Sequence, residues 1–130
     1  RYAGKQTFVF PDPSGKARKT SAGGKTDHNI LENAGFIVKA RNSHPAVKDR
    51  INALNSMLLN SNAEIRLFID PKCKETIRSL QRHAYKEGTM VVDKSTGVDH
   101  QFDALSYAVE YLFPVTKQYT PDPTKSWGVF

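Results

Sequence analysis

Short apolar runs alternate along this 130-residue chain with longer stretches whose apolar residues recur at helical spacing. Three runs have the length and composition of buried strands, and they are Thr7–Phe10, Phe36–Val38 and Ile65–Ile69. Met90–Val92 is a shorter run of the same kind. The first run leads into Pro11-Asp12-Pro13-Ser14-Gly15, a composition that favours a turn.

Two helices are predicted after the first and second of these strands. Thr26 or Asp27 can cap a short helix that ends at Gly35, a residue that suits the end of a helix. Ser43 can cap the next helix, with Pro45 in its first turn, where a missing N–H costs little. The apolar stripe of this second helix is Val47, Ile51, Leu54 and Leu58.

Two further helices complete the predicted order. One follows Asp70-Pro71, and the other begins near Asp99 and ends before Pro114. Their apolar positions are Cys73, Ile77, Leu80 and, less regularly, Ala84 in the first, and Phe102, Leu105, Val109 and Leu112 in the second. Alternation of strands and helices predicts an α/β fold with a mainly parallel sheet flanked by helices. Residues 1–115 form the predicted domain, and residues 116–130 read as an extended tail.

Composition and charge narrow the class of protein. Hydrophobic residues make up 38% and charged residues 25% of the chain, which is globular composition. The apolar runs are too short to span a bilayer, and no signal peptide is recognisable. Cys73 is the single cysteine, which excludes an internal disulfide and a cysteine zinc site and favours a reducing, intracellular setting.

The chain carries a net charge of +6, from 19 Lys and Arg against 13 Asp and Glu, and its pI is about 9.5. A domain this basic attracts polyanions, and a pI above about 9 is one mark of nucleic-acid binding. Many basic domains bind no DNA, so charge alone does not assign the function.

Asp12 is the first candidate for chemistry. It lies just past the end of a predicted strand, where ligands gather in parallel α/β sheets, and it could reach a metal ion from there. Asp-Pro-Ser-Gly is also good turn chemistry, and taken by itself this favours a role for Asp12 in shaping the turn.

Asp99 and Asp103 are the second candidates, because their spacing places both on one face of the last helix. Asp103 lies between Phe102 and Leu105, so it borders the apolar stripe and needs a partner, such as a divalent cation. Asp99 fits equally well as an acid that complements the helix dipole.

Four basic residues follow Asp12 in a polar loop, and they are Lys16, Arg18, Lys19 and Lys25. Positive charge beside acidic ligands suits a phosphodiester substrate, although a solvated loop explains the same residues. Gly24-Lys25-Thr26 lacks the earlier glycine of a phosphate-binding loop, because Lys19 stands there. The histidines show no zinc-binding spacing, and Asp70 is better explained as a helix cap than as a ligand.

Taken together, the segments resemble the C-terminal nuclease domain of tailed-phage large terminase subunits. The resemblance runs from about Phe8 to Phe113. It rests on Phe10-Pro11-Asp12-Pro13-Ser14-Gly15, Lys19-Thr20-Ser21-Ala22, Thr26-Asp27-His28-Asn29-Ile30-Leu31, Asp49-Arg50-Ile51-Asn52 and Asp99-His100-Gln101-Phe102-Asp103-Ala104-Leu105.

This resemblance implies an RNase H-like fold and a metal-dependent DNA endonuclease that cuts concatemeric viral DNA during head filling. It implies that Asp12 and Asp103, helped by Asp99, hold two Mg²⁺ or Mn²⁺ ions. The implied partners are double-stranded DNA, the terminase small subunit and the portal protein, and no membrane. The implied location is the host cytoplasm, at the procapsid portal.

The sequence departs from the family's pattern at its start. The family's first catalytic Asp lies on an earlier strand, and no Asp or Glu precedes Asp12 here. We therefore expect the domain to lack its N-terminal strands, either as a C-terminal fragment or as half of a split gene, and to cut poorly alone. A non-catalytic DNA- or portal-binding module and another RNase H-like enzyme, such as a resolvase, remain alternatives.

Overall fold

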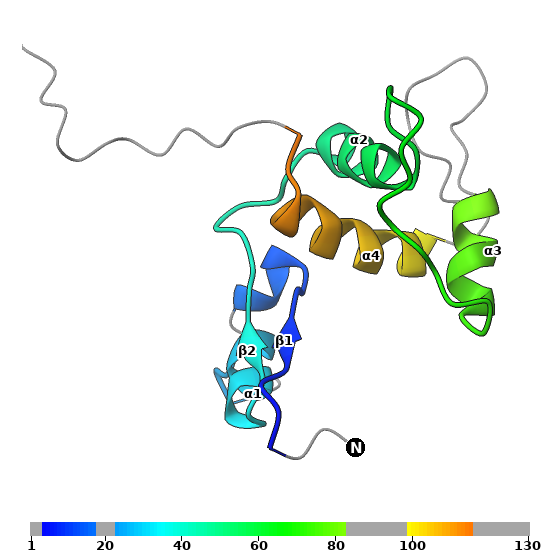
Figure 1. Ribbon diagram of the computed structural model, residues 1–130. Helices are drawn as coiled ribbons and strands as arrows, with labels where there is room; N and C mark the ends of the chain where they lie inside the picture. The colour runs from blue at the N-terminus through cyan, green and yellow to red at the C-terminus, as the bar shows by residue number, and fades with distance from the viewer. Residues whose placement is uncertain (1–3, 18–22, 83–98, 116–130) are drawn as a thin grey trace, which may run out of the picture.

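A computed structural model describes residues 4–17, 23–82 and 99–115 of the chain, without the side chain of Asp99. The described elements run in the order β1 (Phe8–Val9), the 3-10 helix η1 (Pro13–Lys16), α1 (Asp27–Asn33), β2 (Ile37–Val38), α2 (Val47–Leu58), α3 (Lys74–Arg82) and α4 (Asp99–Leu112). The structure is thus a mixed α/β arrangement of helices with one small sheet (Figure 1).

The sheet consists of β1 and β2, which pair in parallel with Phe8 opposite Ile37 and Val9 opposite Val38. The predicted combination of helices with parallel strands is therefore confirmed for these two strands. The chain crosses between them through α1, which the Thr26 side chain caps by accepting from the backbone N–H of Asn29 at 3.0 Å. Gly35 follows the helix with a φ of +90°, a conformation that a side chain would strain.

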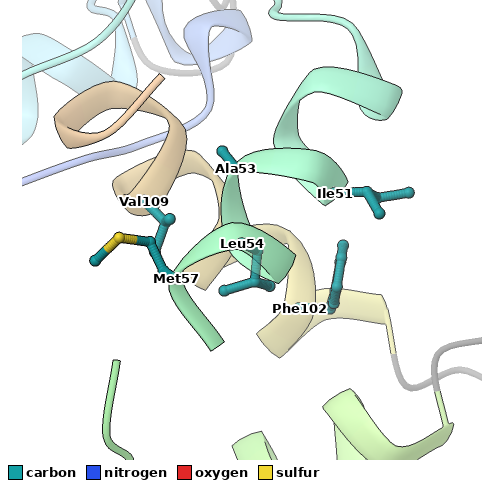
Figure 2. Close-up of a cluster of buried hydrophobic side chains, with 6 residues drawn as sticks. All are labelled: Ile51, Ala53, Leu54, Met57, Phe102 and Val109. Atoms are coloured by element: carbon teal, nitrogen blue, oxygen red, sulfur yellow. The ribbon is translucent and has the colours of Figure 1, made fainter. Parts of the chain in front are cut away.

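The hydrophobic core lies between α2 and α4 (Figure 2). It contains Ile51, Ala53, Leu54, Met57, Phe102 and Val109, with Leu58, Leu67, Leu80 and Leu105 packed against it. Helix α3 joins the core near the start of α4, where the buried Ser79 hydroxyl accepts from the backbone N–H of Phe102 at 3.1 Å. This contact ties α3 to the first turn of α4.

The predicted strand Ile65–Ile69 is wrong, because these residues are extended without pairing to any strand in the described part of the chain. The backbone N–H groups of Arg66 and Leu67 donate instead to the carbonyl of Met57, at 2.9 Å each. Leu67 packs against the helical core, whereas Phe68 is 81% exposed. The apolar run thus covers the end of α2 rather than extending the sheet. The predicted strand Met90–Val92 and the tail 116–130 lie outside the described residues.

Two predicted helix starts are also wrong. The second helix begins at Val47 after Ala46, not after Ser43, and no side chain caps it. A start at Ser43 would require His44 to be helical directly before Pro45, a conformation that the proline ring disfavours. Asp70 does not cap α3. Its carboxylate accepts from the N–H of Lys72 and its carbonyl from that of Cys73, both at 2.8 Å, in a turn before the helix.

Figure 1 shows α4 between two groups of elements. Its length packs on α2, and α3 lies near its first turns. The small sheet, η1 and α1 lie on the side of its C-terminal half. None of the described helices has both the length and the apolar character needed to cross a membrane.

Candidate functional site

Asp12 follows β1 and begins η1, where its carboxylate accepts from the backbone N–H of Ser14 at 2.8 Å. The Asp12 carbonyl lies 3.0 Å from Nε2 of the buried His28 in α1. A side chain at Gly15 would approach the His28 ring to 2.6 Å, so only glycine fits beneath this imidazole. The turn at Asp12 therefore packs directly against α1.

Asp12 also reaches across to α4. The Tyr107 hydroxyl donates to Oδ2 of Asp12 at 3.2 Å, and Nδ1 of His44 lies 3.4 Å from Oδ1. Burial of the Asp12 carboxyl would raise its pKa, but hydrogen bonds from the Ser14 N–H and hydroxyl and from Tyr107, with the nearby His44, lower the pKa below its ordinary value. Asp12 is thus held as a carboxylate by three segments of the chain.

Asp103 lies one turn before Tyr107 on α4 and pairs with Arg50 of α2. Nη1 of Arg50 donates to Oδ1 of Asp103 and to the Ser106 hydroxyl, at 2.8 Å each. The Arg50 side chain is only 7% exposed, against 36% for that of Asp103, and its guanidinium lies 4.3 Å from the centre of the Tyr107 ring. The partner that the position of Asp103 requires is therefore, in this structure, an arginine.

The two candidate carboxylates line one hollow. It has a volume of about 290 Å³ and is lined by Phe10, Pro11, Asp12, His100, Asp103, Ala104 and Tyr107. Burial of the Tyr107 hydroxyl raises its pKa, and the charges of Asp12 and Asp103 raise it further, against the opposing charge of Arg50. Tyr107 therefore stays a neutral donor between two acids from distant parts of the sequence.

The other predicted site residues are Asp99 and the basic residues of the loop after Asp12. Asp99 begins α4, but its side chain lies outside the described part of the structure, as do Arg18 and Lys19. Lys25 is exposed. The Lys16 ammonium donates to the Arg41 carbonyl at 2.9 Å and to Oδ1 of Asn42 at 3.2 Å, which ties η1 to the loop after β2.

A second ion pair on α4 did not emerge from the sequence. Arg41 binds the carboxylate of the buried Glu110 through Nε and Nη2, at 3.1 Å each. Its Nη2 also lies 3.2 Å from the carbonyl of Glu110 and 3.4 Å from that of Tyr111. The guanidinium thus supplies a positive charge to the C-terminal end of α4, where the helix dipole favours one.

Carboxylate oxygens are the donors that Mg²⁺ and Mn²⁺ prefer. Asp12 and Asp103 have this chemistry, yet no group of three or more His, Cys, Asp or Glu side chains that could hold an ion occurs among residues 4–17, 23–82 and 99–115. The described residues therefore offer part of a ligand set rather than a complete one.

Comparisons with family models, curated proteins and solved structures found no match to this chain.

Proposed function

We propose that this chain carries part of a metal-dependent DNA endonuclease site of the RNase H-like type, as in the large terminase subunit of tailed phages. One observation carries the proposal. Asp12 and Asp103, chosen as ligands from the sequence, line one hollow although they come from the end of β1 and from α4. A basic chain suits the DNA substrate, since its +6 charge favours binding to phosphates.

In this proposal Asp12 and Asp103 hold divalent ions, with Asp99 as the further carboxylate on α4. Such ions, when bound, would supply activation of a water molecule and charge stabilisation at the phosphodiester. The Ser14 N–H and Tyr107 hydroxyl keep Asp12 ionised and oriented, and Lys25 with Arg18 and Lys19 holds the DNA backbone. As a terminase subunit, the protein would act with the small subunit at the portal, in the host cytoplasm.

Asp103→Asn in the full protein, with any residues encoded upstream of Arg1, tests the proposal. Supercoiled plasmid is incubated with the protein and Mn²⁺, and nicking is followed over time. We expect the rate to fall at least about 100-fold, as when a group at a reacting centre is removed.

Glu110→Gln is the matched control. Like Asp103, Glu110 is a carboxylate on α4 that pairs with an arginine, but it does not line the hollow. Because Glu110 is buried more deeply than Asp103, Glu110→Gln should lower stability at least as much, yet its nicking rate should stay much closer to that of the wild type. Wild-type nicking by Asp103→Asn would contradict the role of Asp103.

A non-catalytic DNA- or portal-binding module is the second candidate, and the Arg50–Asp103 pair favours it. An arginine at 2.8 Å already balances the charge of Asp103. Binding to DNA or portal that persists in EDTA, with no cleavage in Mg²⁺ or Mn²⁺, would establish this alternative over the nuclease.

A further inference from the structure

The two arginines that bind α4 are satisfied to different degrees. Arg41 uses two nitrogens on the two oxygens of Glu110, the forked contact for which a guanidinium is suited. Arg50 contacts Asp103 through Nη1 alone, which it shares with Ser106. Its Nε is buried and has no hydrogen-bond partner in the described part of the chain.

Arg50 is therefore not arranged for greatest stability. A buried donor without a partner is costly, and a buried charge with one single-point contact recovers less than a forked pair does. Nε and Nη1 of a guanidinium point to opposite sides, so the contact of Asp103 with Nη1 leaves Nε without a partner among the described residues. An unsatisfied buried donor in a folded protein suggests a role other than stability, and the contact of Arg50 with Asp103 offers one.

The contacts around Arg50 hold it in one place. The Ser106 hydroxyl accepts from Nη1, the Tyr107 ring lies against the guanidinium, and the side chain is almost wholly buried. Only Oδ1 of Asp103 is engaged by it, and no hydrogen bond to Oδ2 is found within the described residues. The second oxygen of a carboxylate that lines the hollow is thus left for a ligand.

We propose that Arg50 is a positioning residue, which fixes Oδ1 of Asp103 so that Oδ2 is presented to a divalent cation in the hollow. The part of this inference that concerns the cation rests on the proposed function; the fixing of the Asp103 side chain does not. Removal of a residue that hydrogen-bonds to a metal ligand commonly lowers metal affinity by about 10- to 100-fold.

Arg50→Met tests the inference, with Arg41→Met as the matched control, since Arg41 serves a buried carboxylate on the same helix away from the hollow. Two properties of the full protein are measured: Mn²⁺ affinity by electron paramagnetic resonance, and the χ1 rotamer of Asp103 by NMR three-bond couplings without metal. Arg50→Met should weaken Mn²⁺ binding by about tenfold or more and average the Asp103 rotamer. Arg41→Met does not touch Asp103, so it should leave the Asp103 rotamer unchanged and should weaken Mn²⁺ binding much less than Arg50→Met does.

Arg50→Lys keeps the charge and a single donor, so it should restore part of the Mn²⁺ affinity, and it serves as the test variant if Arg50→Met does not fold. Mn²⁺ binding as tight as in the wild type, or tighter, would overturn the cation role and make Arg50 a competitor of the metal. A single Asp103 rotamer in Arg50→Met would overturn positioning altogether. A third outcome separates the two proposals. If the Asp103 rotamer averages in Arg50→Met but the wild type binds no Mn²⁺, the positioning role is upheld and the proposed nuclease is contradicted.

Discussion

Two parts of the molecule differ in the forces that stabilise them. The helical part comprises α2 to α4, and the sheet part comprises β1, η1, α1 and β2. The helical part has an apolar core in which Leu54 is fully buried. The sheet part contributes no residue to the buried apolar core of the described chain, and it meets α4 mainly through polar groups. These contacts include Arg41 with Glu110 and Asp12 with Tyr107, beside one packing of the Phe10 and Tyr111 rings.

This difference teaches where the stability of the site comes from. Burial of apolar surface is the dominant favourable force in folding, so the helical part supplies most of the stability. The hollow lies at the junction, with Asp103 on the well-packed part and Asp12 on the other. Its shape therefore depends on hydrogen bonds and ion pairs more than on the core.

Leu54→Ala should break the helical part and have the largest effect. Removal of a fully buried leucine side chain leaves a cavity, and we expect a loss of about 2–5 kcal/mol in the free energy of unfolding, measured by urea denaturation. Leu59→Ala, at a leucine that is 60% exposed, is the control and should change stability by less than about 0.5 kcal/mol. Equal losses in the two variants would mean that the α2–α4 core is not the main source of stability.

Thr26→Ala should loosen the sheet part alone, by about 1 kcal/mol, because it removes the oxygen that caps α1. Hydrogen exchange resolves the effect locally: amides of α1 should exchange faster, while those of α2 stay unchanged. Thr26→Ser keeps the hydroxyl and should restore protection. Faster exchange spread evenly over both parts would show that they unfold as one unit.

Asp12→Asn should have the smallest effect on stability, and the effect should disappear in acid. Because the folded-state pKa of Asp12 lies below its ordinary value of 3.8, its carboxylate stabilises the fold above that pH and loses this contribution as the pH falls through the folded-state value. Since the side chain is about half exposed, we expect less than about 1 kcal/mol.

Urea denaturation of the wild type and of Asp12→Asn, repeated between about pH 5 and pH 3, measures this contribution. The stability difference should shrink with acid, and Tyr107→Phe, which removes one of the donors, should fall between them. A difference that stays constant with pH would rule out the carboxylate charge as its cause.

Several elements could be predicted from local sequence signals, whereas elements that depend on distant partners could not. The cap at Thr26, the glycine after α1 and the first two strands depend on neighbouring residues, and all were predicted. The run Ile65–Ile69 looked like a strand, but a strand needs a partner, which no local pattern supplies. Pro45 carried the information that would have placed the start of α2 correctly.

The ion pairs of the site could be recognised only in part from the sequence. Arg50 lies four residues before Leu54 and seven before Met57, on the apolar face of its helix, which indicates a buried cation. Glu110 left no such signal, because its neighbour on the inner side of α4, Ser106, is itself polar. Their partners could not be predicted, because each lies on another element and the pairing depends on how the helices pack.

The contacts that assemble the hollow close very long loops. Asp12 and Tyr107 are 95 residues apart, Arg41 and Glu110 are 69 apart, and Arg50 and Asp103 are 53 apart. A chain emerging from the ribosome carries Asp12 long before it carries α4, and no local contact brings the two acids together in the interval. Until α4 has been made, the nascent polypeptide therefore cannot bring Asp12 and Asp103 to the same hollow.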